Sequence, residues 1–141
     1  MPTQVIRIKG SNTSTGYLDL SDNGHTSALK HNTIKWQIDN HSGVYSITRI
    51  EEKTNSDNIF ETPPHEQGNY WTGVISRSVH PGDEYLYSIY WKASQNGPEY
   101  KHDPKISIRP SLSPIIKILA FVVALISISV FIQLSMKKEK K

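Results

Sequence analysis

The sequence of 141 residues contains no cysteine. This absence excludes a disulfide framework, a thiolate metal site and a cysteine nucleophile. An excess of one charge is also missing from residues 1–110, which hold eleven Lys or Arg and twelve Asp or Glu. Nucleic-acid binding requires a basic patch that neutralises phosphates, so we exclude this class of function. The net charge of +3 therefore originates in residues 111–141, with five Lys and one Glu.

Only one long apolar run is present, at residues 115–134, which read IIKILAFVVALISISVFIQL. Twenty helical residues span about 30 Å, the thickness of the hydrocarbon core of a bilayer. The single charge, Lys117, can extend its ammonium group to the near interface. We therefore predict a transmembrane helix at 115–134, after a linker at 111–114 that keeps the domain close to the bilayer. A Lys-rich tail follows at 135–141.

Residues 1–110 lack a helical stripe of useful length and show alternating apolar and polar residues between turn signals instead. This pattern predicts one all-β domain, an antiparallel Greek-key β-sandwich, followed by a single transmembrane helix. Alternation places Trp36 on the inward face of its strand and Tyr85, Tyr87, Ile89 and Trp91 together on one face of another. The predicted strands are 4–9, 17–20, 33–39, 44–50, 70–76, 85–91 and 105–109. We expect residues 61–69 and 93–103 to be loops.

Three stretches resemble the cupredoxin-like sandwich, the fold of small blue copper proteins. Leu29–Asn40 is similar to the family's turn into an alternating strand that ends in Asn. Tyr85–Ile89 resembles the aromatic-x-aromatic-x-Cys strand that carries a copper thiolate, and Lys105–Arg109 resembles the terminal strand. The resemblance implies a cupredoxin-like fold over most of residues 4–109. An immunoglobulin-like sandwich is the alternative.

The copper ligands of this family are not present. Blue copper requires two imidazoles, a thiolate and usually a weak axial Met. Ile89 stands at the cysteine position, and residues 44–46 replace the region of the first histidine. The later His-x-x-Met region has no counterpart, because Met136 belongs to the tail. The resemblance therefore implies a cupredoxin-like domain without metal or another cofactor.

The histidines and carboxylates do not form a recognisable catalytic or metal-binding motif. None of the six histidines belongs to an H-x-H or H-x-x-x-H pair. His41 and His102, with Asp103, nevertheless leave open an alternative, a histidine-only copper or zinc carrier. The adjacent carboxylates at 51–52 and 83–84 are expected to be solvated, since strand neighbours point to opposite faces. No nucleophile elbow is present, so we expect a protein that is not an enzyme.

Aromatic residues near the loops are the best indication of a binding surface. Tyr90 lies on the opposite strand face from the inward aromatic residues, while Tyr70 and Tyr100 adjoin loops. Such side chains bind partner proteins or other ligands. We expect a membrane-anchored, non-enzymatic interaction or scaffold domain, which contacts lipid through residues 115–134 and a protein or other ligand through loops 40–43 and 93–103. The predicted binding residues are His41, Tyr90, Tyr100 and His102.

The side of the membrane is predicted from two opposing arguments. Lysines in the tail at 135–141 favour retention of the tail in the cytoplasm by the positive-inside rule. The domain side also carries Lys101, Lys105, Arg109 and Lys117, so the charge bias is small. No apolar export segment opens the sequence, and a short tail is easier to move than a folded sandwich. We therefore expect a tail-anchored arrangement with a cytoplasmic domain, and an extracytoplasmic domain is the alternative.

Overall fold

The computed structural model describes the backbone of residues 1–112 and 114–139, with side chains over residues 1–112 and 118–137. The chain divides into two units, Met1–Pro110 and Ser111–Lys141, and each is described by itself. Among the described residues, the first unit contains ten strands and the second contains one helix. The sequence also assigns expectations to the side chains of Lys117, Lys138, Lys140 and Lys141, which lie outside the described side chains.

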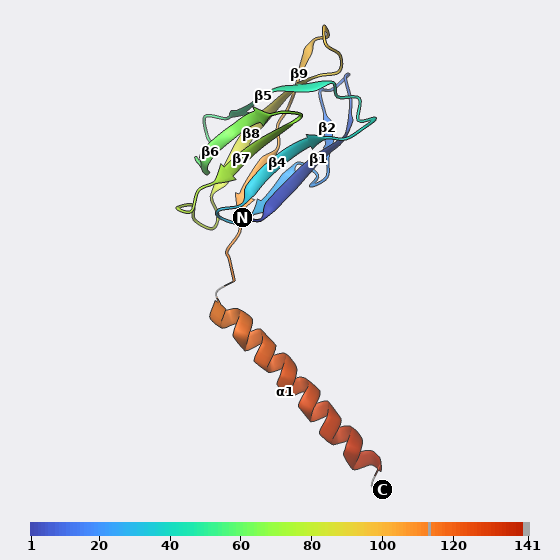
Figure 1. Ribbon diagram of the computed structural model, residues 1–141, viewed down its shortest axis with the longest axis vertical. Coiled ribbons are helices and arrows are strands. Elements are labelled where there is room, and N and C mark those ends of the chain that lie inside the picture. Colours follow the sequence, from blue (N-terminus) through green and yellow to red (C-terminus); the bar gives the residue numbers. More distant parts are fainter. Residues whose placement is uncertain (113, 140–141) are drawn as a thin grey trace. The chain divides into compact units, whose positions relative to one another are not determined.

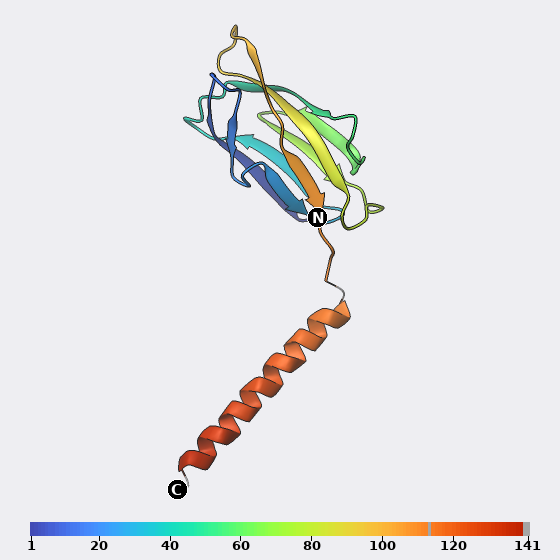
Figure 2. The same cartoon turned by 180° about the vertical axis from the view of Figure 1, so that it is seen from behind.

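The first unit is a two-sheet sandwich, which confirms the predicted fold class (Figure 1). One sheet has the order β2 (Leu18–Leu20), β1 (Thr3–Ser11), β4 (Thr33–Ile38), β7 (Tyr70–Ile75) and β6 (Phe60–Gln67). The other has the order β3 (His25–Ala28), β10 (Lys105–Ile108), β8 (Glu84–Lys92) and β5 (Ser46–Glu52), and β9 (Glu99–His102) also pairs with β8. The view from behind brings β8 and β10 forward (Figure 2).

Two strand pairs are parallel, whereas the sequence predicted an antiparallel sandwich. β1 runs parallel to β4, and β3 runs parallel to β10. Parallel neighbours require a crossover connection. The connection from β1 to β4 is such a crossover. It passes through β2, which belongs to the same sheet as β1 and β4, and through β3, which belongs to the other sheet. All other pairs are antiparallel, and the Greek-key connectivity stays a prediction.

The core between the sheets follows the predicted alternation. Trp36 on β4 is fully buried, as are Tyr87, Ile89 and Trp91 on β8. The Trp36 indole Nε1–H donates a hydrogen bond of 3.1 Å to the hydroxyl oxygen of Tyr87. A buried indole N–H needs such an acceptor, so this contact joins the two sheets by a polar bond inside an apolar core.

Strand β5 departs from simple alternation because it contains a bulge. The register with β8 shifts between Ile47 and Arg49. As a result Ile47 and Ile50, which are three positions apart, are both buried, while Arg49 is exposed. Simple alternation along the predicted strand 44–50 would put Ile47 and Arg49 on one face, but an extra residue reverses the side-chain order after the bulge.

Three strands were not predicted, because the composition of each lacks the usual alternation of large apolar and polar residues. β6 contains Pro63 and Pro64, which are tolerated because this strand lies at a sheet edge and has two register shifts against β7. β9 carries mostly polar residues within the predicted loop 93–103. β3 buries only the small side chains of Thr26 and Ala28 and therefore lacks an apolar signal.

The second unit contains helix α1 (Pro114–Glu139), which extends beyond the predicted apolar run at both ends. Its segment Ile118–Lys137 has a mean hydropathy of 2.5 and is long and apolar enough to cross a membrane. The hydroxyls of Ser127 and Ser129 donate to carbonyl oxygens four residues earlier, at 3.0 and 3.1 Å. Their polar groups are therefore satisfied within the helix, as a lipid environment requires. The helix fits a single-pass membrane protein.

Candidate functional site

We define the loop end of the sandwich as the end formed by residues 12–17, 39–45, 67–70 and 93–98 (Figure 1). It lies opposite the end where Met1 begins and Ile108 completes β10. The predicted site residues lie in or near these loops. Their side chains, however, have three different environments.

Tyr100 and His102 point toward the interior of the sandwich. On β9, Tyr100 pairs with Trp91 and His102 pairs with Ile89 of β8, and both partners are fully buried. The ring of Tyr100 lies 4.7 Å from that of Trp91 between centroids. Cross-strand partners have their side chains on the same face of a sheet. Tyr100 and His102 therefore face the interior of the sandwich and not the outer surface of the loop end.

The surroundings of His102 favour the neutral form of its imidazole. Burial lowers its pKa below the ordinary value, although the carboxylates of Asp103 and Asp22 act in the opposite direction. Its Nε2 atom is buried and has no hydrogen-bond partner among the described residues. The ring of Tyr17 meets it edge-on, with 5.0 Å between centroids. The His102 ring is thus half-buried and in contact with an aromatic side chain.

Tyr90 lies on the outer face of the same sheet, opposite to Trp91. The guanidinium of Arg49 covers its ring, with 3.8 Å from the guanidinium carbon to the ring centroid. Arg49 also forms ion pairs of 3.1 Å with Glu99 and 3.3 Å with Glu51. The Tyr90 face is therefore already covered by a cation that two carboxylates hold in place.

His41 is exposed in the loop between β4 and β5. Its backbone has a φ of 64°, in the left-handed region that few side chains favour. The loop is fixed to the end of β1, because the hydroxyl of Ser11 donates a hydrogen bond of 2.9 Å to the carbonyl oxygen of Ser42. The four predicted residues thus comprise two inward side chains, one on the outer face and one on a loop. Over the described part of the chain, no three His, Asp or Glu side chains are grouped to hold a metal ion.

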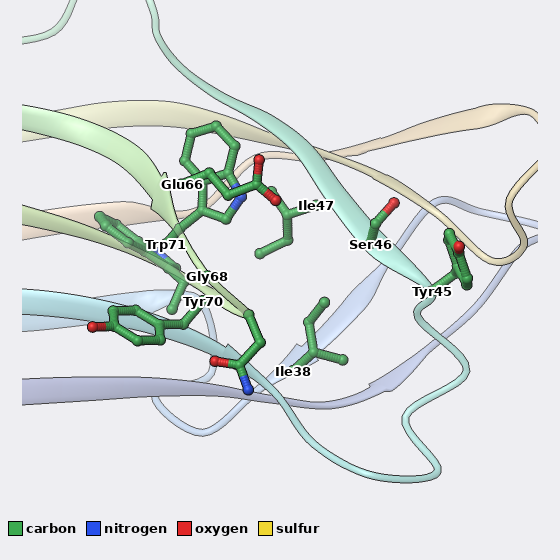
Figure 3. Close-up of a pocket in the computed structure, with 10 residues that line it drawn as sticks. Ile38, Tyr45, Ser46, Ile47, Glu66, Gly68, Tyr70 and Trp71 are labelled. Atoms are coloured by element: carbon green, nitrogen blue, oxygen red, sulfur yellow. The ribbon is translucent and has the colours of Figure 1, made fainter.

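The structure shows a pocket at the loop end that the sequence did not predict (Figure 3). It opens between β5, the edge of one sheet, and the β6–β7 hairpin at the edge of the other. Its volume is about 390 Å³, within the range of small-ligand sites. The lining residues are Trp36, Ile38, Tyr45, Ser46, Ile47, Glu66, Gly68, Asn69, Tyr70 and Trp71.

The pocket combines an apolar surface with few polar groups. Ile38 and Ile47 face one another across it from the two sheets, and Trp71 lies beside them (Figure 3). Tyr45, directly before β5, has an exposed fraction of 57% and lies on the side away from Trp71 (Figure 3). Such an arrangement is typical of a recognition site.

Glu66 provides the only charged side chain of the lining. It pairs with Trp71 across the β6–β7 hairpin and therefore shares its face of the sheet. In Figure 3 its carboxylate extends from β6 toward Ile47. No Lys, Arg or His of the described side chains lies within ion-pair distance of this carboxylate. Glu66 is exposed and therefore gives the pocket a solvent-accessible carboxylate without an ion-pair partner among the described side chains.

Tyr70 was the one lining residue whose position in the sequence indicated a site, because it adjoins a loop. Its side chain belongs to the rim, and the Nζ of Lys35 lies 4.1 Å from its ring centroid. Lys35 is not a lining residue, since it alternates with the inward Ile34 and Trp36 along β4. The cation at this ring therefore lies on the outer side of the sheet.

A second, shallower cavity of about 450 Å³ lies on the outer face of the other sheet. It includes Tyr90 and side chains of both charges, such as Glu52, Lys53 and Lys101. Lys53 and Lys101 both contact Asp103, at 3.0 and 3.7 Å. The paired charges and open shape indicate a solvated polar surface, so the pocket containing Glu66 is the stronger candidate.

Comparison with known proteins does not assign the chain to a family. No protein-family description matches it, and no curated protein sequence matches it significantly.

Proposed function

We propose that this protein is a membrane-anchored, non-enzymatic interaction domain that binds its ligand at the loop end of the sandwich. The observation that carries the proposal is the pocket between β5 and the β6–β7 hairpin, with exposed Tyr45 and half-buried Trp71. Aromatic side chains of this kind provide a large contact area with little loss of conformational entropy. A folded domain with one such pocket is suited to binding.

Helix α1 supports the membrane part of the proposal. Its 20-residue candidate span, Ile118–Lys137, matches about 30 Å of hydrocarbon. The bilayer is then the first partner, and a protein or other ligand at the loop end is the second. An anchor confines the sandwich to a surface, which raises its effective concentration toward partners in the same membrane.

We place the binding site in the pocket, beside the loop that contains His41. Tyr100 and His102 do not line this pocket and pack against Trp91 and Tyr17 instead. Tyr90 is covered by Arg49. The loop 40–43 stays part of the proposed surface, since residues just before and after it line the pocket.

We further propose that the sandwich is cupredoxin-like. Its parallel pairs, β1–β4 and β3–β10, support this fold over an immunoglobulin-like one, which consists of two antiparallel sheets. Ile89, at the position of the copper thiolate in the resemblance, is fully buried in the core. A domain of this kind binds its ligand without the family's metal.

Copurification from native membranes tests the proposed function. The full-length wild type is compared with Tyr45→Ala, and Tyr17→Ala is the matched control, because Tyr17 is a similarly exposed loop-end tyrosine outside the pocket. We expect a stoichiometric partner with the wild type and the control, and its loss with Tyr45→Ala. If both variants retain the partner equally well, the binding site does not include Tyr45. A wild-type protein without any stoichiometric partner would refute the interaction function.

A further inference from the structure

The charge of the pocket identifies the chemical class of its ligand. Glu66 is its single charged lining residue, and the remaining polar side chains, Ser46, Asn69 and the tyrosine hydroxyls, are neutral. An anionic ligand would be repelled by this carboxylate. A cationic ligand would supply the partner that the described side chains do not provide.

The aromatic rings favour the same class. Trp71 lies on the same sheet face as Glu66, directly across the hairpin, so one group can contact both the ring and the carboxylate. A cation over an aromatic face is attracted by the ring quadrupole, most strongly at Trp. An ammonium group that contacts an aromatic ring and a nearby carboxylate is attracted by both, through the ring quadrupole and through the negative charge.

The remaining surface of the pocket limits the shape of the ligand. Ile38 and Ile47 offer an apolar contact that suits methyl or methylene groups next to the charge. A volume of about 390 Å³ accommodates a compact head group and not a globular surface. A hydrated metal ion would gain little from isoleucine contacts, whereas an organic cation buries its carbon atoms there.

We propose that this pocket binds a compact organic cation, either a free quaternary ammonium compound or the ammonium group of a lysine side chain of a partner protein. This inference rests on the proposed function, because it concerns the ligand of the same site. The competing explanation is that Glu66 only protects the edge strand β6, where an inward-facing charge prevents pairing with other chains. That role predicts no ligand.

Titration of the full-length protein in neutral detergent tests the inference. Tetramethylammonium chloride and a short peptide with one lysine are the probes, sodium chloride is the salt control, and tryptophan fluorescence is the readout. We expect saturable binding that weakens about two- to fivefold in Glu66→Gln, as for the loss of one exposed ion pair. Glu61→Gln, an exposed carboxylate on the same strand outside the pocket, should bind as the wild type does.

The outcomes separate the two sources of the cation and the two proposals. Binding of the peptide alone indicates a lysine of a partner, and binding of tetramethylammonium alone indicates a free quaternary ammonium compound. Binding of neither probe, or equal affinity in Glu66→Gln, refutes the cation inference. In that case a partner that still copurifies with the wild type and not with Tyr45→Ala would leave the interaction function intact.

Discussion

Removal of the Trp36 indole is the most direct test of how the two sheets are joined. Trp36 is fully buried, with its ring centroid 5.8 Å from Tyr87 and 6.3 Å from Phe60. Trp36→Ala leaves a large cavity in a core that can collapse only partly, so we expect a loss of about 3–5 kcal/mol in the free energy of unfolding. A domain of this size has roughly 5–15 kcal/mol in total.

The contribution of the hydrogen bond between Trp36 and Tyr87 can be measured separately with a pair of single variants and their double variant. Tyr87→Phe leaves the buried indole N–H without an acceptor, which costs about 1–3 kcal/mol. Trp36→Phe leaves the Tyr87 hydroxyl without its donor and also loses packing. The double variant lacks both polar groups, so its loss should be smaller than the sum of the single losses by about 1–2 kcal/mol.

Urea unfolding of the full-length protein in detergent measures these losses. All three tryptophans, Trp36, Trp71 and Trp91, belong to the sandwich, so their fluorescence reports on this unit and not on the helix. Val5→Ala on the exposed face of β1 is a control with an expected change within about 0.5 kcal/mol. A loss below about 1 kcal/mol for Trp36→Ala would refute the assigned packing, and additive losses in the cycle would refute the hydrogen bond.

Three further predictions concern the backbone, pH and the membrane. Gly16 has a φ of 80° and a Cβ there would lie 2.8 Å from the carbonyl oxygen of Lys101, so Gly16→Ala should lower stability by about 1–3 kcal/mol. In urea titrations Gly68→Ala, with a φ of 64° and no atom within 4 Å, should cost less, and an equal cost would exclude the close contact. Because burial lowers the pKa of His102, protonation favours the unfolded state, and stability should fall as the pH drops below about 6.5. His102→Phe should reduce this loss of stability at low pH. If the variant lost as much stability as the wild type, other titrating groups would be responsible for the loss. We expect protease added to sealed right-side-out vesicles to spare the sandwich, since moving residues 135–141 across a bilayer requires no unfolding. Digestion without detergent would show the opposite orientation.

The sequence was sufficient to predict the sandwich wherever one face of a strand is buried and the other is not. Alternation in β4 and β8 predicted the burial of Trp36 and Trp91, and a long apolar run with a single charge predicted the helix. It failed where tertiary context replaces the local signal. β6 accepts two prolines because its outer edge makes no ladder hydrogen bonds, and the bulge after Ile47 moves Ile50 to the inner face.

The pocket could not be predicted from the sequence, because no local pattern connects its walls. Its lining residues fall within three segments, 36–38, 45–47 and 66–71, which come from both sheets. Trp71 belongs to the predicted strand 70–76, whereas Glu66 lies in the predicted loop 61–69. Only the cross-strand pairing of Glu66 with Trp71 shows that they share a face. In contrast, Tyr100 and His102 suggested a surface because they are polar aromatic residues near a loop.

The pairing of β10 has a consequence for the order of folding. This strand pairs on one side with β3, whose residues come about 80 positions earlier in the chain, and on the other side with β8. Contacts between such distant residues form slowly, because a long loop must close before they contribute. Only residues 109–113 separate β10 from the helix. During synthesis, therefore, the sandwich cannot close until the chain has been made almost to its apolar segment, and the β3 edge must stay exposed until then.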